Sequence, residues 1–119
     1  LTYLKERKQF DAIIGTFQAL QHRAAEMFCE LEICQSVVLD ALSALEERRN
    51  DTPRAASLAT ARLSDASRLI TNEGVQMHGG IGMTDAGDVG LFLKRARVQA
   101  QMLGDAHFHR RRYADLGGY

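Results

Sequence analysis

The sequence predicts an all-α protein built as an up-down bundle of four helices. Alanine is abundant and proline occurs once, so little interrupts helix formation along the 119 residues. Apolar residues recur at steps of three and four over three long segments, the spacing that gives a helix one apolar face. A chain of this length can form one domain with one core.

The chain opens with a segment, residues 1–7, that is typical of the end of a helix. It has neither an N-cap residue nor a leading Met, and a short connector over residues 8–15 follows it. We therefore expect a fragment in which most of the first bundle helix is missing, and a missing helix should fill an open side of the bundle.

The second helix should begin at Gly15-Thr16, with Thr16 as its N-cap, and end in the charged cluster of residues 46–50. Its apolar positions predict one stripe that faces a core. They are Phe17, Leu20, Ala24, Met27, Leu31, Val38, Leu42 and Leu45.

The third helix should begin at Asp51-Thr52-Pro53, because either of the first two residues can cap it and proline fits the first turn. It should end near residues 76–78, since Gly79-Gly80 can adopt the left-handed turn that ends helices. Its stripe is made of small side chains: Ala55, Ala59, Leu63, Ala66 and Ile70.

The last long helix should follow a glycine-rich loop over residues 79–90, with Asp88 as its cap. Gly104 interrupts this helix, and a basic tail with Arg110-Arg111-Arg112 follows. We expect these arginines and His107 and His109 to be solvated. The apolar positions of the helix are Val89, Phe92, Ala96, Ala100 and Leu103.

The composition excludes several classes of function. Fifteen basic and fifteen acidic residues cancel, so no net field attracts nucleic acid or a membrane, and no apolar run is long enough to span a bilayer. No zinc spacing or Glu-x-x-His pair predicts a metal site. Cys29 and Cys34 should be small core residues of a protein kept in a reducing, cytoplasmic compartment.

Arg7 is the first candidate for binding a ligand. It lies at the end of a helix in the sequence Arg7-Lys8-Gln9-Phe10. Its guanidinium can fork onto a phosphate through two hydrogen bonds, or it can simply complement the helix dipole. The motif alone leaves both interpretations open.

The second candidate is the stretch Gln76-Met77-His78-Gly79-Gly80-Ile81-Gly82. Glycines beyond a helix end let backbone amides approach a ligand closely, and a run of such amides suits an anion. The alternative is a helix end followed by a loop. The Rossmann fingerprint is excluded, because no strand is apparent before the glycines.

In order and spacing, these segments together resemble the C-terminal domain of acyl-CoA dehydrogenases. The resemblance rests on Tyr3, Arg7, Gln9-Phe10, Phe17-Gln18, an alanine-rich helix and the stretch from Gln76 to Gly82, and it runs to about Gly104. It implies that an N-terminal helical domain and a middle β-barrel precede this domain in the whole enzyme, which oxidises an acyl-CoA thioester to the 2,3-enoyl-CoA with FAD.

The resemblance also implies site residues. Arg7 should contact the pyrophosphate of FAD, characteristically the FAD of a neighbouring subunit, with Phe10 packed beside it and Gln18 as a weaker candidate. Gln76 and the backbone at His78, Gly79 and Gly80 should line the adenosine end.

The sequence departs from the family at four places. Asp11 replaces a common Gly, and Lys94-Arg95-Ala96 stands where many members have Arg-Asp-Ala. Asp105-Ala106-His107 does not match the family's Thr-Ser-Gln-like segment. The position of the catalytic glutamate holds Leu103, which cannot take a proton, so we assign no catalytic residue to this chain. Either the base lies upstream on the first helix, or the chain comes from a non-catalytic partner subunit or interaction module.

The resemblance further implies partners. They are an acyl-CoA substrate, other subunits of a dimer or tetramer, and an electron-transferring flavoprotein. It places a bacterial protein in the cytoplasm and a eukaryotic one in the mitochondrial matrix. The fragment alone should be inactive.

Overall fold

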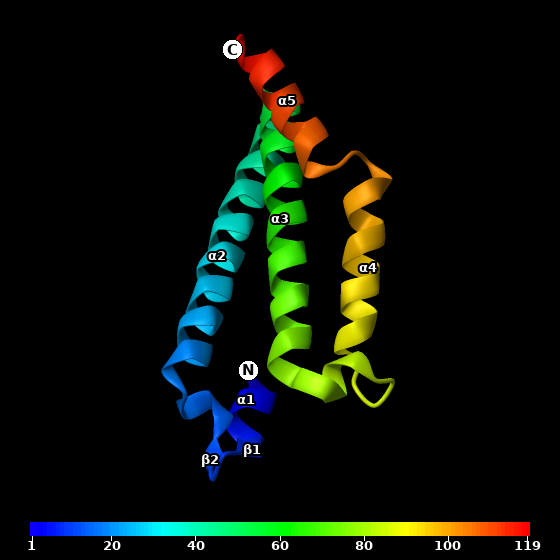
Figure 1. Ribbon diagram of the computed structural model, residues 1–119. Helices are drawn as coiled ribbons and strands as arrows, with labels where there is room; N and C mark the ends of the chain where they lie inside the picture. The colour runs from blue at the N-terminus through cyan, green and yellow to red at the C-terminus, as the bar shows by residue number, and fades with distance from the viewer.

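The computed structural model describes residues 1–119, and most of them are helical. Helices α2 (Gln18–Glu46), α3 (Thr52–His78) and α4 (Val89–Met102) lie side by side, and α5 (Ala106–Gly117) packs at one end (Figure 1). Helix α3 is central, because α2, α4 and α5 all pack against it. The molecule is elongated, with extents of 57 × 26 × 25 Å. The predicted all-α fold is confirmed.

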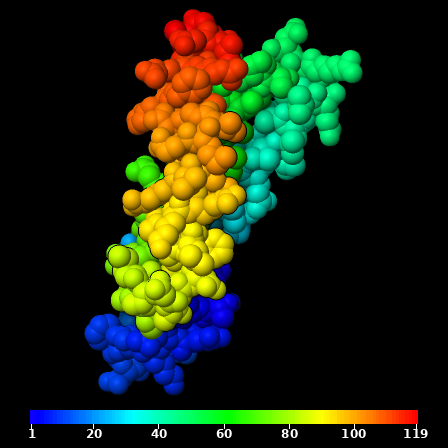
Figure 2. All heavy atoms as spheres, turned by 90° about the vertical axis from the view of Figure 1, so that its right-hand side faces the viewer, coloured from blue at the N-terminus to red at the C-terminus, as the bar shows by residue number.

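The N-terminal connector has a structure that the sequence did not predict. After α1 (Thr2–Glu6), strands β1 (Lys8–Gln9) and β2 (Ala12–Ile13) form a small antiparallel hairpin, and the 3-10 helix η1 (Ile14–Thr16) leads into α2. In the space-filling view of Figure 2, this N-terminal region lies at the end of the molecule opposite α5.

The start of α2 differs from the prediction. Thr16 does not cap the helix, because its hydroxyl donates a hydrogen bond to the carbonyl of Ile13 at 2.7 Å. Helix α2 begins at Gln18, with Phe17 in the N-cap position and no side-chain cap. The 3-10 turn occupies the residues that the sequence pattern assigned to the helix start.

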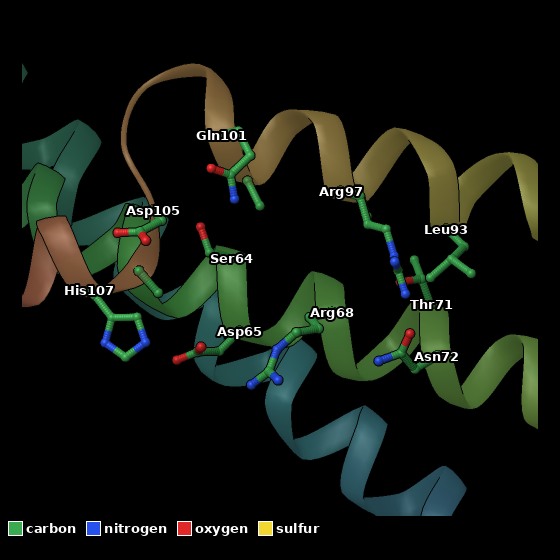
Figure 3. Close-up of a pocket in the computed structure, with 13 residues that line it drawn as sticks. Ser64, Asp65, Arg68, Thr71, Asn72, Leu93, Arg97, Gln101, Asp105 and His107 are labelled. Carbon is green, nitrogen blue, oxygen red and sulfur yellow. The ribbon is translucent and has the colours of Figure 1, made fainter.

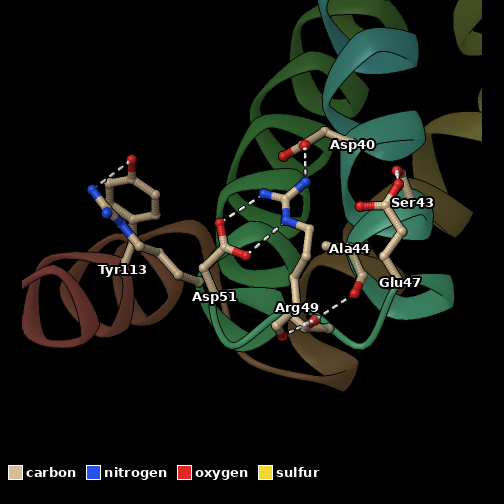
Figure 4. A network of polar contacts seen from close by, with 9 residues as sticks. Asp40, Ser43, Ala44, Glu47, Arg49, Asp51 and Tyr113 are labelled. Atoms are coloured by element: carbon tan, nitrogen blue, oxygen red, sulfur yellow. Dashed lines mark hydrogen bonds and ion pairs between the residues drawn. The ribbon is translucent and has the colours of Figure 1, made fainter.

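The turn between α2 and α3 is held by a network centred on Arg49 (Figure 4). Its guanidinium donates to both carboxylate oxygens of Asp51, at 2.9 and 2.7 Å, and to Asp40 at 2.9 Å. The hydrogen bonds from Arg49 lower the pKa of Asp51. Asp51 occupies the N-cap position without a side-chain cap bond, and the hydroxyl of Thr52 donates to the carbonyls of Ala44 and Arg49 instead.

Other helix boundaries agree with the prediction. Pro53 lies in the first turn of α3, and α3 ends at His78. Gly79 has a positive φ of 62°, but its ψ of −142° differs from the left-handed turn that the sequence suggested. Asp88 is in the N-cap position of α4, although its side chain makes no cap hydrogen bond. Residues 79–83 form a second 3-10 helix, η2.

The apolar stripe of α2 is only partly buried. Its N-terminal third packs against the core, whereas Leu31, Leu42 and Leu45 are 47%, 52% and 63% exposed. Phe92 of α4 is exposed as well. A helix face is buried only where another element covers it, and these faces have no cover. That an upstream helix fills the open side stays a prediction.

The basic tail belongs to an ordered helix, α5. Asp105 caps α5 by accepting a hydrogen bond from the amide of Phe108 at 2.7 Å. Arg110 forms an ion pair with Asp65, and Arg112 donates to the hydroxyl of Ser57 at 2.7 Å. The expectation of solvated arginines is therefore wrong for Arg112, which is half-buried, whereas Arg110 stays exposed although it is paired.

The expectation of two solvated histidines and the expectation of two core cysteines are each wrong for one residue. His109 is buried, whereas His107 is exposed, because residues two apart on a helix point in different directions. Cys34 is buried as predicted, and burial raises the pKa of its thiol. Cys29, by contrast, is exposed on α2.

Candidate functional site

A small apolar core fixes the N-terminal end of the molecule. Leu4 of α1, Ile14 of η1 and Met77 of α3 are buried together, and Tyr3 and Leu20 pack against them. This core ties residues at the start of the chain to the end of α3, more than 70 positions later. Both sequence motifs that suggested ligand binding therefore lie at one place.

Beside this core is a cavity of about 430 Å³. It brings together six of the seven residues that the resemblance assigned to FAD, from two separate segments of the chain. The lining residues are Tyr3, Arg7, Gln9, Phe10, Ile14, Phe17, Leu20, Arg23, Gln76, Met77, His78, Gly79, Gly80 and Ile81. We call this space the hairpin cavity.

Arg7 is the unpaired cation of the hairpin cavity. Its backbone is fixed, because its amide donates to Tyr3 and its carbonyl accepts from Ile14, both at 2.9 Å. Its guanidinium takes part in no ion pair or side-chain hydrogen bond of the structure. A fixed backbone with a free, half-buried guanidinium suits an anionic ligand.

Phe10 stands at the tip of the hairpin. Phe10 and Asp11 are the two turn residues between the paired Gln9 and Ala12, with φ of 54° and 58°. Such two-residue turns normally use Asn-Gly, so this left-handed pair is strained. The ring of Phe10 is 86% exposed and meets Phe17 edge to face, at 6.3 Å between centroids. An exposed ring held in this way is available to pack against a ligand.

His78 is fixed at the opposite wall of the hairpin cavity. Its ring stacks on Tyr3 with centroids 4.3 Å apart, and its Nδ1 lies 2.7 Å from the carbonyl of Gly74. Because a carbonyl can only accept, Nδ1 must carry the proton. The hydroxyl of Tyr3 donates to the carbonyl of His78 at 3.3 Å. The end of α3 is thus held in position next to Gly79 and Gly80, which we call the glycine turn.

The glycine turn itself is open. No atom lies within 4 Å of the positions that a Cβ would occupy on Gly79 or Gly80, and both glycines are exposed. Gly79 has the positive φ that L-residues avoid. The preceding Gln76 is also exposed and lines the hairpin cavity. A ligand can therefore approach this stretch of backbone closely.

Arg23 is a lining residue that the sequence gave no reason to select. It forms a forked ion pair with Glu73, with Nε–Oε2 at 2.6 Å and Nη2–Oε1 at 2.8 Å. The hydrogen bond to Glu73 raises the pKa of Arg23. The two partners are 50 positions apart, so no local pattern connects them. Since its charge is already paired, Arg23 supports the wall and leaves Arg7 as the free cation.

Gln18 is the one predicted FAD residue that does not line the hairpin cavity. It is the first residue of α2 and is exposed. Its assignment stays a prediction that this geometry does not support.

Leu103 lies elsewhere, at the far end of α4. It is the C-cap of that helix and is 80% exposed. Fourteen helical residues separate it from the loop that follows the glycine turn, a rise of about 21 Å. Its carbonyl lies 2.9 Å from Nε2 of His109. The side chain at this position carries no group that could take up a proton.

The chemical capacity of the hairpin cavity follows from these parts. It offers one free guanidinium, accessible backbone and exposed aromatic surface, which together suit a ligand with phosphate and a flat ring. No three side chains among His, Cys, Asp and Glu converge as a metal site would require. No helix is both long and apolar enough to cross a membrane.

Comparison with known proteins identifies the family of the chain. The model of the family described as "Acyl-CoA dehydrogenase, C-terminal domain" matches residues 1–116. The acyl-CoA dehydrogenase IpdE2 of Mycolicibacterium smegmatis is 41% identical over 106 residues, covering 87% of this chain and 32% of that protein. The mitochondrial short/branched chain specific acyl-CoA dehydrogenase of Bos taurus is 34% identical over 98 residues, covering 82% of this chain and 22% of that protein.

Solved structures show the same relationship. A variant of the Tcur3481-Tcur3483 steroid ACAD superposes with a TM-score of 0.93 at 30% identity, covering 98% of this chain and 32% of that one. A structure described as an FAD-dependent dehydrogenase superposes with a TM-score of 0.89 at 26% identity, covering 98% of this chain and 31% of that one. The chain thus spans about a third or less of the length of these relatives. It belongs to the acyl-CoA dehydrogenase family and corresponds to the C-terminal domain of that family.

Proposed function

We propose that this chain is the FAD-binding and oligomerisation domain of a flavin-dependent acyl-CoA dehydrogenase. One observation carries the proposal: six residues that the family resemblance assigns to FAD line a single cavity, although they come from opposite ends of a 70-residue stretch. The buried core of Leu4, Ile14 and Met77 holds these two segments together.

In the proposed arrangement the chain's own residues bind and orient the ADP part of FAD. The guanidinium of Arg7 pairs with the pyrophosphate, and Phe10 packs beside it. Gln76 and the backbone at His78, Gly79 and Gly80 line the adenosine end. The bound flavin would supply a hydride acceptor for the acyl thioester.

The FAD in the hairpin cavity would belong to a neighbouring subunit. The position of the family's base, Leu103, is separated from the glycine turn by the length of α4, about 21 Å. One chain therefore presents the ADP site and the base position at different places. A dimer or tetramer, homomeric or heteromeric, would combine these sites from different chains.

The exposed leucines of α2 support the oligomerisation role, because large uncovered apolar faces seek partners. In sedimentation velocity we expect the 119-residue chain alone to self-associate. A compact, stable monomer would argue against this role.

The whole protein would be an FAD-dependent oxidoreductase of lipid metabolism that acts on an acyl-CoA. An N-terminal helical domain and a β-barrel domain would precede residues 1–119, which alone would be inactive. We place the whole protein in the cytoplasm, as the similarity to IpdE2 of a bacterium suggests, or in the mitochondrial matrix if it is eukaryotic. An electron-transferring flavoprotein would reoxidise the flavin. A structure described as such a flavoprotein, from Acidaminococcus fermentans, shares the fold with a TM-score of 0.90 and 29% identity.

The test is Arg7→Ala in the protein of natural length. A charge-assisted hydrogen bond contributes about 1.5–3 kcal/mol, so we expect FAD affinity to fall roughly ten- to hundredfold. Arg7→Lys should recover only part of this loss, because lysine lacks the fork. Lys8→Ala is the matched control, since Lys8 is an adjacent exposed cation that does not line the hairpin cavity.

Flavin absorbance after desalting, set beside the melting temperature, distinguishes the alternatives. If Arg7 only complements the dipole of α1, the variant should lose a little thermal stability and keep its FAD. Equal FAD retention in Arg7→Ala and wild type would show that Arg7 does not contact FAD.

A second candidate function is a non-catalytic partner subunit, and Leu103 favours it. The leucine is exposed at the family's base position, and the Tcur3481-Tcur3483 steroid ACAD is named as a pair of components. The discriminating measurement is flavin reduction by acyl-CoA under anaerobic conditions. A natural-length protein that reduces its own flavin must hold a base upstream. One that does so only with a second gene product is a partner subunit.

A further inference from the structure

The imidazole of His78 gives the hairpin cavity a hydrogen-bond acceptor whose identity the fold fixes. Its Nδ1 lies 2.7 Å from the carbonyl of Gly74 and must donate to it, so in the neutral ring Nε2 carries the free lone pair. Unlike the buried Nδ1 of His109, Nε2 of His78 makes no hydrogen bond within the chain and yet remains accessible to solvent. A ligand in the cavity can therefore use this acceptor.

Tyr3 holds the imidazole in this orientation. The two rings stack with centroids 4.3 Å apart and an interplanar angle of 25°, and the hydroxyl of Tyr3 donates to the carbonyl of His78 at 3.3 Å. A flip of the imidazole would place a carbon instead of Nδ1 at the carbonyl of Gly74, and that hydrogen bond would be lost. The acceptor is thus presented in one way only.

No other lining side chain of the hairpin cavity is held as an acceptor. The lining includes no carboxylate, and Arg7 and Arg23 can only donate. The amides of Gln9 and Gln76 are exposed and can turn either way. A ligand group that donates a hydrogen bond is therefore favoured beside His78, whereas a ligand group that can only accept is not.

The larger cavity of the molecule, about 740 Å³ between α3 and α4, has a different composition (Figure 3). Two carboxylates, Asp65 and Asp105, line it together with Arg68 and Arg97, so its formal charges cancel. Figure 3 also shows that Arg68 points away from α4. Of the two cavities, the hairpin cavity is the one that combines a free cation with a neutral, oriented acceptor.

We propose that His78 selects the base of the bound dinucleotide, because its Nε2 accepts a hydrogen bond from the 6-amino group of adenine. The inference rests on the proposed function, in which Arg7 pairs with the pyrophosphate and the end of α3 lines the adenosine end. Adenine presents a donor at position 6, whereas hypoxanthine and guanine present a carbonyl oxygen there. That oxygen would face the lone pair of Nε2, and neither atom would have a donor, so the cavity should discriminate against 6-oxo purines.

Exchange of the bound flavin measures this selection in the natural-length holoprotein. The protein is incubated with an excess of an equimolar mixture of isotopically labelled FAD and the FAD analogue that carries hypoxanthine in place of adenine. When the resident FAD has been replaced, the protein is desalted and its flavins are quantified by chromatography. The two ligands share the flavin and the pyrophosphate, so the bound ratio reports on the base alone. We expect FAD to be preferred at least about tenfold.

Two variants separate the ring nitrogen from the ring itself. His78→Phe keeps an aromatic ring next to Tyr3 but has no acceptor, so the bound ratio should fall to within about twofold of one. His78→Gln offers an amide oxygen and should recover part of the preference. Arg7→Lys is the matched control, because it should weaken the binding of both dinucleotides alike and leave their ratio unchanged.

Equal retention of the two dinucleotides by the wild-type protein would overturn the proposal, and this measurement needs no variant to fold. An unchanged preference for FAD in His78→Phe would overturn it as well. Both results would leave FAD bound and the proposed function intact. Wild-type protein that binds neither dinucleotide would contradict the proposed function, and this inference with it.

Discussion

Two glycine turns of this chain have opposite surroundings. Gly79, at the end of α3, and Gly104, between α4 and α5, both have positive φ, at 62° and 101°. Around Gly79 the space where a Cβ would lie is empty, whereas at Gly104 the same position is 2.5 Å from the ring of Phe108 and 3.2 Å from Nε2 of His109. The first turn borders a cavity and is accessible, while the second is filled by the protein itself.

Under the proposed function, the open turn would border the FAD site, whereas the residue before the filled turn, Leu103, cannot act as the family's base. The open turn retains the residues that the family resemblance assigns to FAD, and Arg7 faces it with an unpaired charge. The filled turn follows the family's base position, which here holds Leu103 and is fixed through its carbonyl by His109. Substitutions in the two turns should accordingly affect different properties.

Gly104→Ala should have the largest effect on stability. The new methyl group would be strained by the positive φ and would collide with Phe108. We expect a loss of roughly 2–4 kcal/mol in the free energy of unfolding. Urea denaturation of the natural-length protein measures this. A loss below about 1 kcal/mol would show that the turn is not tightly packed.

Gly79→Ala should have a smaller effect on stability and a separate effect on the ligand. No atom obstructs the methyl group, so only the backbone conformation of Gly79, with φ 62° and ψ −142°, opposes it, at about 1–3 kcal/mol. The methyl group would, however, stand where a ligand approaches the backbone. We expect weaker FAD retention in Gly79→Ala and unchanged retention in Gly104→Ala at temperatures where both are folded. The reverse order of FAD affinities would contradict the assignment of the open turn.

Replacing Asp105, the cap of α5, should have the smallest effect on stability, and this effect should depend on pH. The hydrogen bond from the Phe108 amide lowers the pKa of Asp105 in the folded protein. Its contribution is therefore complete above the unfolded pKa of about 3.9 and is lost as the pH falls through the lower, folded value. Asp105→Asn keeps a capping oxygen without a titrating charge.

The difference in melting temperature between wild type and Asp105→Asn should thus be constant from pH 7 to about 5 and shrink in more acidic buffer. Thermal melts recorded by circular dichroism measure this difference in melting temperature. A difference that grows on acidification would mean that the carboxylate does not stabilise the cap.

Local chemistry explains which parts of the fold the sequence predicted. Pro53 marks the start of α3 because its ring fixes φ, and Gly79 marks the end because the absence of a Cβ permits a positive φ. Six of the residues that line the hairpin cavity were selected by the family resemblance, because the ordered motifs carry information that no single residue does. Arg7 alone was also compatible with a simple dipole contact.

Long-range contacts explain what the sequence did not predict. The burial of His109 and the ordering of α5 depend on α3, whose Asp65 and Ser57 accept from residues 45 and 55 positions later. The pair Arg23–Glu73 has the same character. Phe10 and Asp11 have positive φ although neither is glycine, so no turn signal marked the hairpin. Partners that distant in sequence leave no periodicity to detect.

The FAD content of the natural-length protein tests the proposed flavin site directly. We expect the protein to purify yellow, with FAD near one equivalent per hairpin cavity, measured from the flavin and protein absorbance of desalted samples. Colourless protein that also fails to bind added FAD would contradict the claim that this cavity is a flavin site.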